Sequence, residues 1–234
     1  WSSDVCSSDL NKIEIRKVYI KNKELIEKGD FKNGVYWFRN PNPTRYLFGP
    51  SAFNLKAGEG YYQNTYLILN SYNYGITDNI SIGGGVELIS LFSFSNEGPI
   101  FILTPKVGFE VAPKFNLGGG VIYLSYPGFL SSSRTGLGIA YGVATYGTEN
   151  SNITGGIGWG FVEGDFSSTP VFTISGMHRM SRKTALVSEN WLVSDGNTYA
   201  GIYSYGIRFF GEKLAVDLAF LNNQEISSNL TLGR

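Results

Sequence analysis

Large apolar residues alternate with small or polar ones along most of the chain after residue 60. In Asn79–Phe92 one set of alternate positions carries Ile, Ile, Gly, Val and Leu, whereas the other carries Ser, Gly, Gly and Glu. Phe101–Val111 and the segments on either side of Gly211 divide in the same way. A period of two residues predicts β-strands with one bulky apolar face and one small or polar face. Tyr62–Tyr74 and Val171–Arg182 give mixed faces, which the pattern does not assign.

Short polar turns separate these strands at regular intervals. They recur about every 30 to 38 residues, which fits two long strands and two connections per period. The connections between these repeats tend to be longer, as in Ser93–Gly98 and Pro127–Gly136. Short turns at one end and longer loops at the other predict an up-and-down antiparallel sheet. The repeated turn-and-strand units are Gly75–Leu88, Val111–Leu124, Gly147–Gly160, Ser181–Trp191 and Gly211–Leu221.

Strand length and the polar face together indicate which medium each face meets. A strand of about 14 residues is roughly 46 Å long and crosses a bilayer when tilted, whereas strands of soluble proteins usually have about five or six residues. The polar face is rich in glycine and poor in charge, so it would make a poor surface in water. We therefore expect the bulky face to meet lipid and the small and ionised residues to line an enclosed interior. The predicted fold is an all-β, antiparallel, up-and-down transmembrane β-barrel of about 12 strands, with about eleven present and the last one missing.

The composition agrees with this prediction and excludes several classes of protein. The chain has 30 glycines and 15% aromatic residues, and no run approaches the roughly 18 apolar residues of a membrane-spanning helix. Its 19 basic and 19 acidic residues balance, which argues against a nucleic-acid partner. Aromatic residues gather near the strand ends, as two interfacial girdles would require. The expected girdle residues are Tyr72, Tyr74, Phe92, Phe94, Phe115, Tyr123, Tyr126, Trp159, Trp191 and Phe209.

The first ten residues, WSSDVCSSDL, resemble the translation of a common sequencing adapter. We interpret residues 1–10 as an assembly artefact fused to a metagenomic fragment and exclude them from fold reasoning. Without Cys6 the chain has no cysteine, so we expect neither disulfides nor thiolate metal sites. Residues 11–38 are rich in charge and are interpreted as the tail of an upstream periplasmic module and a linker. The two prolines of RNPNPTRY favour extended structure and place the barrel at 39–234, truncated at its C-terminus.

Four stretches carry a resemblance to a known family. RNPNPTRYLFGPSAFNLKAGEGYYQN (Arg39–Asn64), NYGITDNISIGGGVEL, FILTPKVGFEV and YGIRFFGEKLAVDLAF resemble Bacteroidota outer-membrane β-barrel proteins of unassigned function. The resemblance covers roughly Gly34–Gln224 and implies a signal, a small periplasmic module and a barrel in the bacterial outer membrane. Members end on a strand with a terminal aromatic residue, and NLTLGR departs from that pattern. The resemblance implies no ligand, reaction, cofactor or catalytic residue.

Six charged residues on the polar faces are candidates for a site inside the barrel. They lie within about ten residues of a short turn, so they would share one half of the interior. One interpretation is a mutually neutralising network that plugs a narrow barrel, and the other is a permeation or binding path with a chosen sign of charge. The residues of this predicted lumen charge network are Glu87, Lys106, Glu110, Glu189, Arg208 and Asp217.

Enzymatic and metal sites have less support. A barrel hydrolase would need His178, the sole histidine, beside a serine such as Ser175 or Ser181 and an orienting group such as Glu189. No nucleophile motif surrounds these serines, so we expect no catalytic residues. Turn and loop carboxylates could bind calcium weakly, but their spacing supports no site, and we expect no metal and no cofactor. These carboxylates are Asp78, Glu97, Asp165 and Asp195.

The sequence therefore predicts an integral outer-membrane β-barrel protein with a structural, binding or small-solute transport role. Its expected partners are outer-membrane lipid and small solutes, no nucleic acid is expected, and the sequence indicates no particular protein partner. Two alternatives stay open. One is an outer-membrane lipid-modifying barrel enzyme that uses His178, and the other is a soluble periplasmic β-protein in which the two faces are reversed.

Overall fold

The computed structural model describes residues 31–32, 35–92, 99–126, 135–194 and 198–223. The chain divides into two compact units, Trp1–Arg39 and Asn40–Arg234. In the first unit, β1 (Phe31–Lys32) pairs antiparallel with β2 (Val35–Tyr36). The adapter-like residues 1–10, the charged residues 11–30, the loop Ser93–Gly98 and the final NLTLGR lie outside the described residues, so what the sequence predicts for them stays a prediction.

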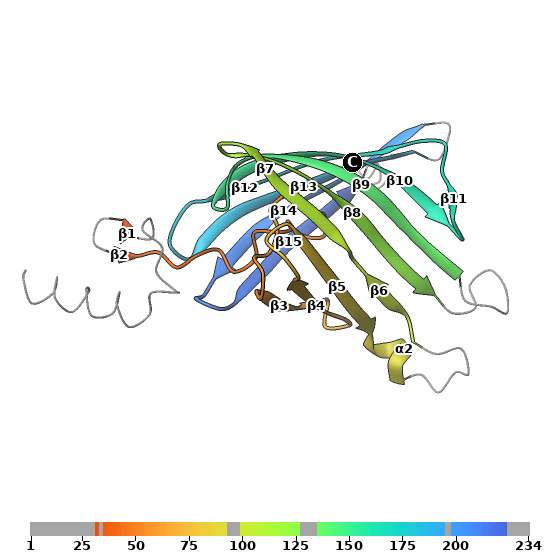
Figure 1. Ribbon diagram of the computed structural model, residues 1–234, viewed down its shortest axis with the longest axis horizontal. Helices are drawn as coiled ribbons and strands as arrows, with labels where there is room; N and C mark the ends of the chain where they lie inside the picture. Colours follow the sequence, from red (N-terminus) through yellow and green to blue (C-terminus); the bar gives the residue numbers. More distant parts are fainter. Residues whose placement is uncertain (1–30, 33–34, 93–98, 127–134, 195–197, 224–234) are drawn as a thin grey trace, which may run out of the picture. The chain divides into compact units, whose positions relative to one another are not determined.

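The second unit is dominated by one antiparallel sheet of thirteen strands (Figure 1). The path through this sheet runs in the order β15-β14-β13-β12-β10-β9-β8-β6-β5-β4-β3, so the strands follow one another in chain order. This confirms the predicted all-β, antiparallel fold. The strands are β3 (Gly60–Thr65), β4 (Leu69–Gly75), β5 (Ile80–Glu87), β6 (Phe101–Leu103), β7 (Lys106–Ala112), β8 (Phe115–Tyr126), β9 (Thr135–Thr148), β10 (Ser151–Val162), β11 (Asp165–Phe166), β12 (Val171–Arg179), β13 (Thr184–Ser194), β14 (Tyr199–Phe210) and β15 (Ala215–Asn223).

Two predicted strands differ from those observed. The strand expected over Asn79–Phe92 ends at Glu87 and continues as the short helix α2 (Leu88–Phe92), because the Glu87 carboxylate accepts hydrogen bonds from the next backbone N–H groups. The strand expected over Phe101–Val111 is interrupted between β6 and β7, where Pro105 has no N–H to give to the sheet. Both halves pair with β5 and β8, so they act as one broken strand.

The two faces of the sheet have the opposite character to those of a soluble sandwich. We call the face that contacts residues 40–55 the inward face and the other the outward face. Val107, Ile207 and Val216 point outward and are 40%, 40% and 46% exposed, although they are large and apolar. Their neighbours Lys106 and Arg208 point inward and are buried. The alternation in the sequence therefore corresponds to an apolar outward face and a small or charged inward face.

The mixed segment Val171–Arg182 is explained by what its inward side chains meet. Phe172 and Ile174 point outward in β12 and are exposed, whereas Ser175 and Met177 point inward and are buried. Met177 is a large apolar residue on an inward face that is otherwise small or charged. Its sulfur lies 4.0 Å from the Asn40 amide nitrogen and 3.8 Å from an Arg208 nitrogen, and it accepts weak hydrogen bonds from both.

A row of aromatic rings crosses the outward face near the longer loops. Phe101, Tyr123, Phe161 and Phe166 follow one another with ring centroids 6.2, 6.5 and 5.2 Å apart. The Phe161 ring from β10 lies over Gly138, where a Cβ atom would stand 2.7 Å from it, and the Tyr123 ring from β8 lies over Gly136. Such a row fits a girdle at a membrane interface. Within the described residues, no helix is long and apolar enough to cross a membrane.

Trp191, which the sequence assigns to a girdle, points inward instead. Its indole N–H donates a 2.7 Å hydrogen bond to the inward carboxylate of Glu189, two residues earlier on the same strand. Residues two apart on a strand share a face, so the direction of Glu189 determines that of Trp191. The prediction for Trp191 is therefore wrong.

Candidate functional site

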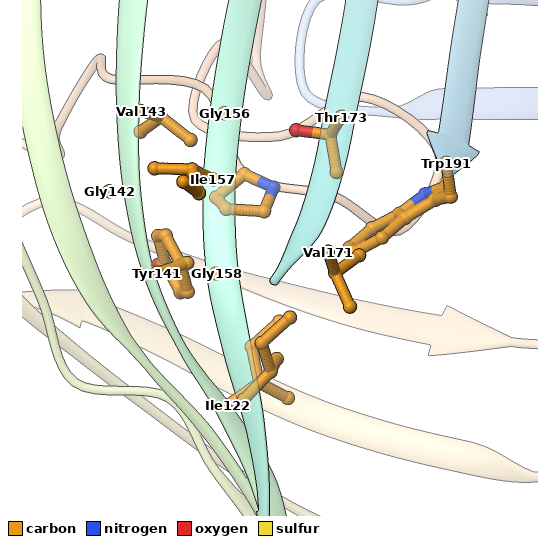
Figure 2. A pocket seen from close by; sticks show the side chains of 12 residues that line it. Ile122, Tyr141, Gly142, Val143, Gly156, Ile157, Gly158, Val171, Thr173 and Trp191 are labelled. Atoms are coloured by element: carbon orange, nitrogen blue, oxygen red, sulfur yellow. The ribbon is translucent and has the colours of Figure 1, made fainter. Parts of the chain in front are cut away.

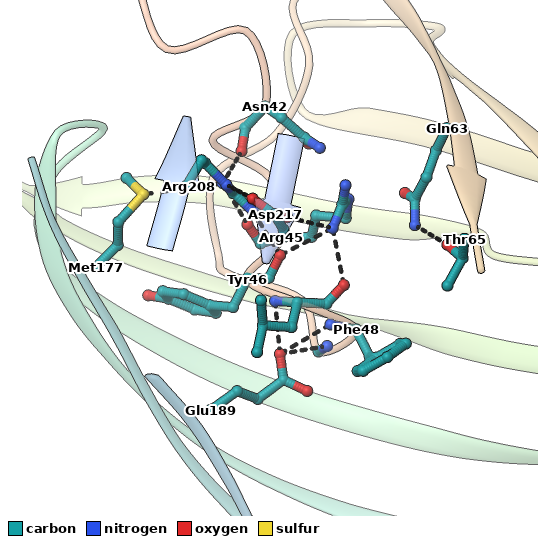
Figure 3. Close-up of polar contacts among 12 residues, drawn as sticks. Asn42, Arg45, Tyr46, Phe48, Gln63, Thr65, Met177, Glu189, Arg208 and Asp217 are labelled. Atoms are coloured by element: carbon teal, nitrogen blue, oxygen red, sulfur yellow. Dashed lines mark hydrogen bonds and ion pairs between the residues drawn. The ribbon is translucent and has the colours of Figure 1, made fainter. Parts of the chain in front are cut away.

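Residues Asn40–Leu55, which we call the inner segment, lie against the inward face of the sheet. The prolines at positions 41, 43 and 50 keep this segment from joining the sheet as a strand. It folds on itself instead: the Tyr46 N–H donates to the Gly49 carbonyl at 2.9 Å, and the Ser51 N–H donates to the Thr44 carbonyl at 3.0 Å. In Figure 1 it is the orange stretch that precedes β3, and Figure 3 shows its central residues among the strands.

Glu189 of β13 binds the tight turn of the inner segment. One oxygen of its carboxylate accepts three hydrogen bonds, each 2.9 Å long, from the consecutive backbone N–H groups of Leu47, Phe48 and Gly49. The other oxygen accepts the bond from Trp191. Three successive N–H groups that converge on one point form an anion-binding nest. The Glu189 side chain is fully buried and is held by backbone dipoles rather than by a cation.

Arg208 of β14 holds the other side of the same turn. Its guanidinium forms a two-pronged ion pair with Asp217 of β15, at 2.6 and 2.9 Å. The remaining donors point at backbone carbonyls of the inner segment, those of Tyr46 at 2.6 Å and Asn42 at 3.0 Å. Arg208 is fully buried, and its planar fork suits several fixed acceptors at once. Figure 3 shows the fork between Asn42, Tyr46 and Asp217.

Lys106 of β7 hydrogen-bonds to two positions of the inner segment, one on each side of its tight turn. Its ammonium group donates to the carbonyl of Thr44 at 3.0 Å and to that of Phe53 at 2.5 Å. Lys106 is buried, and in the described part of the chain it makes no salt bridge. A buried ammonium group that is satisfied only by carbonyls fixes the positions of those carbonyls, because losing either bond would leave a charge without solvation.

Hydroxyl groups continue these contacts across β9 and β10. The Tyr46 hydroxyl lies 2.6 Å from the Thr154 hydroxyl and 2.6 Å from the Asn152 amide oxygen. Thr154 in turn contacts Thr145, whose hydroxyl accepts the Ala52 N–H at 2.8 Å. Burial raises the pKa of Tyr46 to about 12, because the phenolate would lose its hydration.

Adjacent residues of the inner segment reach the two opposite ends of the strand order. The Thr44 hydroxyl lies 3.1 Å from the hydroxyl of Tyr61 on β3, and Arg45 lies 3.4 Å from the carboxylate of Asp217 on β15. β3 and β15 are the two terminal strands of the sheet, and no described strand pairing joins them. Because one short segment contacts strands from one end of the order to the other, the sheet must curl around it.

Four of the six residues predicted as a lumen charge network meet at this site. Lys106, Glu189, Arg208 and Asp217 all contact the inner segment, through the bonds given above. Glu87 and Glu110 do not. Glu87 binds backbone N–H groups of α2, and the exposed Glu110 accepts the backbone N–H of Lys114 at 3.2 Å.

The charges neutralise one another only in part, because Arg208 pairs with Asp217 whereas Glu189 and Lys106 are held by backbone groups. Among the described salt bridges only Arg208 and Arg45 pair with a carboxylate, that of Asp217. Arg45 and Tyr46 were not among the predicted site residues, because RNPNPTRY served only to place a domain boundary and to support the family resemblance. Its polar residues between prolines, in a chain otherwise poor in charge, were the available signal.

Beyond the inner segment, the inward face becomes apolar around a small cavity (Figure 2). The cavity holds about 10 Å³, room for a single water molecule. It is too small to be a ligand site in this conformation. Its walls include Pro50, Ile122, Ile139, Tyr141, Val171 and Trp191.

The residues named for the alternative hydrolase do not gather around His178. Ser175 is buried on the inward face, Ser181 lies in a turn where it contacts the Thr184 hydroxyl, and Glu189 binds the inner segment. His178 is exposed on the outward face, where its Nδ1 atom lies 2.6 Å from the hydroxyl of Ser151. The described residues contain no group of three His, Cys, Asp or Glu side chains that could hold a metal; Glu97 and Asp195 lie outside them.

No family model, curated protein or solved structure matches this chain.

Proposed function

We propose that this protein is an integral outer-membrane β-barrel whose interior is occupied by its own inner segment, and that its role is structural or binding. One observation carries the proposal: the outward face exposes large apolar side chains from the first strand pairs to the last, while the ionised side chains of Lys106, Glu189 and Arg208 point inward and are buried. In water such a surface would far exceed the apolar patches that monomeric soluble proteins tolerate. In a bilayer it would meet hydrocarbon, and the inward charges would be shielded from it.

The strand lengths also support a membrane setting. β9 has 14 residues, and β8, β10 and β14 have 12 each. About 9 to 11 tilted residues are enough to cross the hydrocarbon core. In our proposal the sheet closes, because lipid offers no partner for unpaired strand edges.

Occupancy of the interior favours a structural or binding role over free passage of solutes. Four of the six charges that could have lined a conduit hold the inner segment, and two of these, Arg208 and Glu189, have no exposed surface. The inner segment directly follows the first unit in the chain. We therefore infer that the barrel anchors the upstream module, with the short turns in the periplasm and the longer loops outside.

Nitroxide labels test the proposed sidedness. Val107→Cys and Val216→Cys, labelled after reconstitution into liposomes, should collide more often with lipid-soluble oxygen than with a water-soluble nickel complex. Ala57→Cys, in the exposed turn before β3, is the matched control and should show the reverse preference. Nickel accessibility at Val107 and Val216 equal to that at Ala57 would contradict the proposal. A shift in gel mobility on boiling reports in each case that the detergent-folded barrel is intact.

A second candidate function, lipid hydrolysis by a barrel enzyme, is favoured by the contact between Ser151 and His178. A serine hydroxyl bonded to a histidine is the minimal nucleophile and base pair. The described residues provide no hydrogen bond to the other ring nitrogen of His178, so nothing fixes its tautomer. His178→Ala and Ser151→Ala should each abolish ester hydrolysis in mixed micelles if this function holds, and unchanged turnover would remove it.

A further inference from the structure

The outward face is hollowed where β12 and β13 carry small residues. Gly176 pairs with Ser188 across these strands, and the larger Ile153 and Tyr205 flank the pair on β10 and β14. The small residues between larger ones leave an apolar groove of about 850 Å³. Ligand pockets in proteins have roughly 300 to 1,000 Å³, so the groove is large enough for a lipid chain.

The polar side chains on the floor of the groove use their hydrogen-bond donors within the sheet. The Asn190 amide donates to the Ile174 carbonyl at 3.1 Å and to the Ser188 hydroxyl at 3.1 Å. The Ser188 hydroxyl donates to the Ser204 carbonyl at 3.3 Å. Groups whose hydrogen bonds are already made can be covered by hydrocarbon at little cost. The floor can therefore accept an acyl chain although it contains an amide and a hydroxyl.

The end of the groove near the short turns is polar and basic. His178 lines the groove there, is exposed, and shares a hydrogen bond with Ser151. The turn that follows β12 carries Arg182 and Lys183, of which Lys183 is exposed. Such an end complements an anionic headgroup.

The charges on the two neighbouring turns do not cancel the positive charge at this end of the groove. The turn between β9 and β10 carries Glu149, and the turn between β14 and β15 carries Glu212 beside Lys213. The turn after β12, which lies between them in the strand order, is the one with two basic residues and no acidic one. An anion is therefore favoured at the middle of this end of the groove.

We propose that the groove binds one anionic phospholipid, with an acyl chain over Gly176 and Ser188 and the phosphate at His178 and Lys183. This inference rests on the proposed function, because it needs the outward face to lie in a membrane. The imidazole and ammonium groups supply the hydrogen-bond donors that a phosphate requires. The hollow gives the chain more contact area than the surrounding surface does.

Native mass spectrometry of the detergent-solubilised chain tests the proposal, with phosphatidylglycerol and phosphatidylcholine of identical chains as probes. We expect one phosphatidylglycerol to be retained at least about tenfold more tightly than phosphatidylcholine, the effect of about 1.4 kcal/mol. Ser188→Leu fills the groove and should abolish retention of both lipids. Its matched control is Gly84→Leu on the outward face of β5, where a Cβ atom meets nothing closer than 3.7 Å.

The headgroup assignment has its own variants. The double variant His178→Ala/Lys183→Ala should retain both lipids equally, whereas Lys114→Ala, in the turn before β8, should behave as the wild type. Wild-type retention by Ser188→Leu, or equal affinity of the wild type for both lipids, would overturn the proposal. Gly176→Ala replaces Ser188→Leu if that variant does not fold. Absence of membrane insertion in the wild type would contradict the proposed function, whereas normal insertion without lipid retention contradicts this inference alone.

Discussion

The carboxylate of Glu189 lies 2.9 Å from the backbone nitrogen of Gly49, across 140 residues of sequence. The Gly49 N–H donates to the carboxylate, and the absence of a side chain at position 49 allows the close approach. A Cβ atom at position 49 would lie 3.3 Å from the carboxylate carbon of Glu189 and 3.1 Å from the Trp191 ring. The turn of the inner segment can therefore approach β13 closely enough for three N–H groups to share one oxygen.

Replacing Glu189 by Ala should destabilise the protein strongly. Three N–H groups would lose their acceptor, and each of the two in buried surroundings, those of Leu47 and Gly49, costs about 1–3 kcal/mol when unsatisfied. Glu189→Gln keeps an acceptor oxygen and should lose about half as much. Urea unfolding in detergent, followed by tryptophan fluorescence, measures both losses. Equal stability of Glu189→Ala and the wild type would show that the inner segment is not held as described.

Adding a side chain at Gly49 should push the turn away from β13. Gly49→Ala is expected to cost about 1–3 kcal/mol, the usual range for overpacking. Trp191→Leu in the same chain should recover part of this loss, because the nearest clashing atom belongs to Trp191. A double-mutant cycle on unfolding free energies gives the coupling. Additive losses in the double variant would argue against direct contact.

The ion pair between the fully buried Arg208 and the partly exposed Asp217 should show strong coupling. Arg208→Leu leaves Asp217 with only the longer contact to Arg45, at 3.4 Å, and is expected to cost about 3–5 kcal/mol. Arg208→Leu/Asp217→Leu removes the stranded charge and should be more stable than the single variant. The comparison uses thermal unfolding of folded barrels in detergent. A double variant less stable than Arg208→Leu would contradict this account.

Stability should fall at alkaline pH through Tyr46. Its folded pKa is raised to about 12, above the ordinary value of about 10, so the unfolded chain loses the phenol proton first. The contribution is fully present below about pH 10 and is lost as the pH rises towards about 12, a change of about 3 kcal/mol. Tyr46→Phe should be less stable near neutral pH but should lack this part of the alkaline decline. Parallel pH profiles of the two proteins would rule out the assignment.

The sequence predicts those features that depend on local periodicity. Alternation identifies the strands and the outward direction of residues such as Val107 and Val216, because side chains on a strand point to opposite faces in turn. It likewise places Lys106, Arg208 and Asp217 on the inward face. Pro105 interrupts one strand and the Glu87 carboxylate ends another. Both effects follow from the chemistry of the single residue involved.

The partners of the inward charges could not be predicted in the same way. Lys106 binds carbonyls 62 and 53 positions away, and Arg208 binds the carbonyl of Asn42 across 166 positions. These acceptors are backbone atoms, which every residue possesses, so no side-chain pattern marks them. Trp191 is different, because its inward direction follows from local periodicity: it lies two residues after the inward Glu189 on the same strand.

The contacts of Thr44 and Arg45 with opposite ends of the strand order have a consequence for the order of assembly. Thr44 meets Tyr61 after 17 positions, but Arg45 meets Asp217 only after 172. Contacts that close so long a loop form slowly, since the entropy of closure must be overcome before they contribute. We expect maturation to end in one late cooperative step, in which the last strands arrive and lock a segment synthesised far earlier.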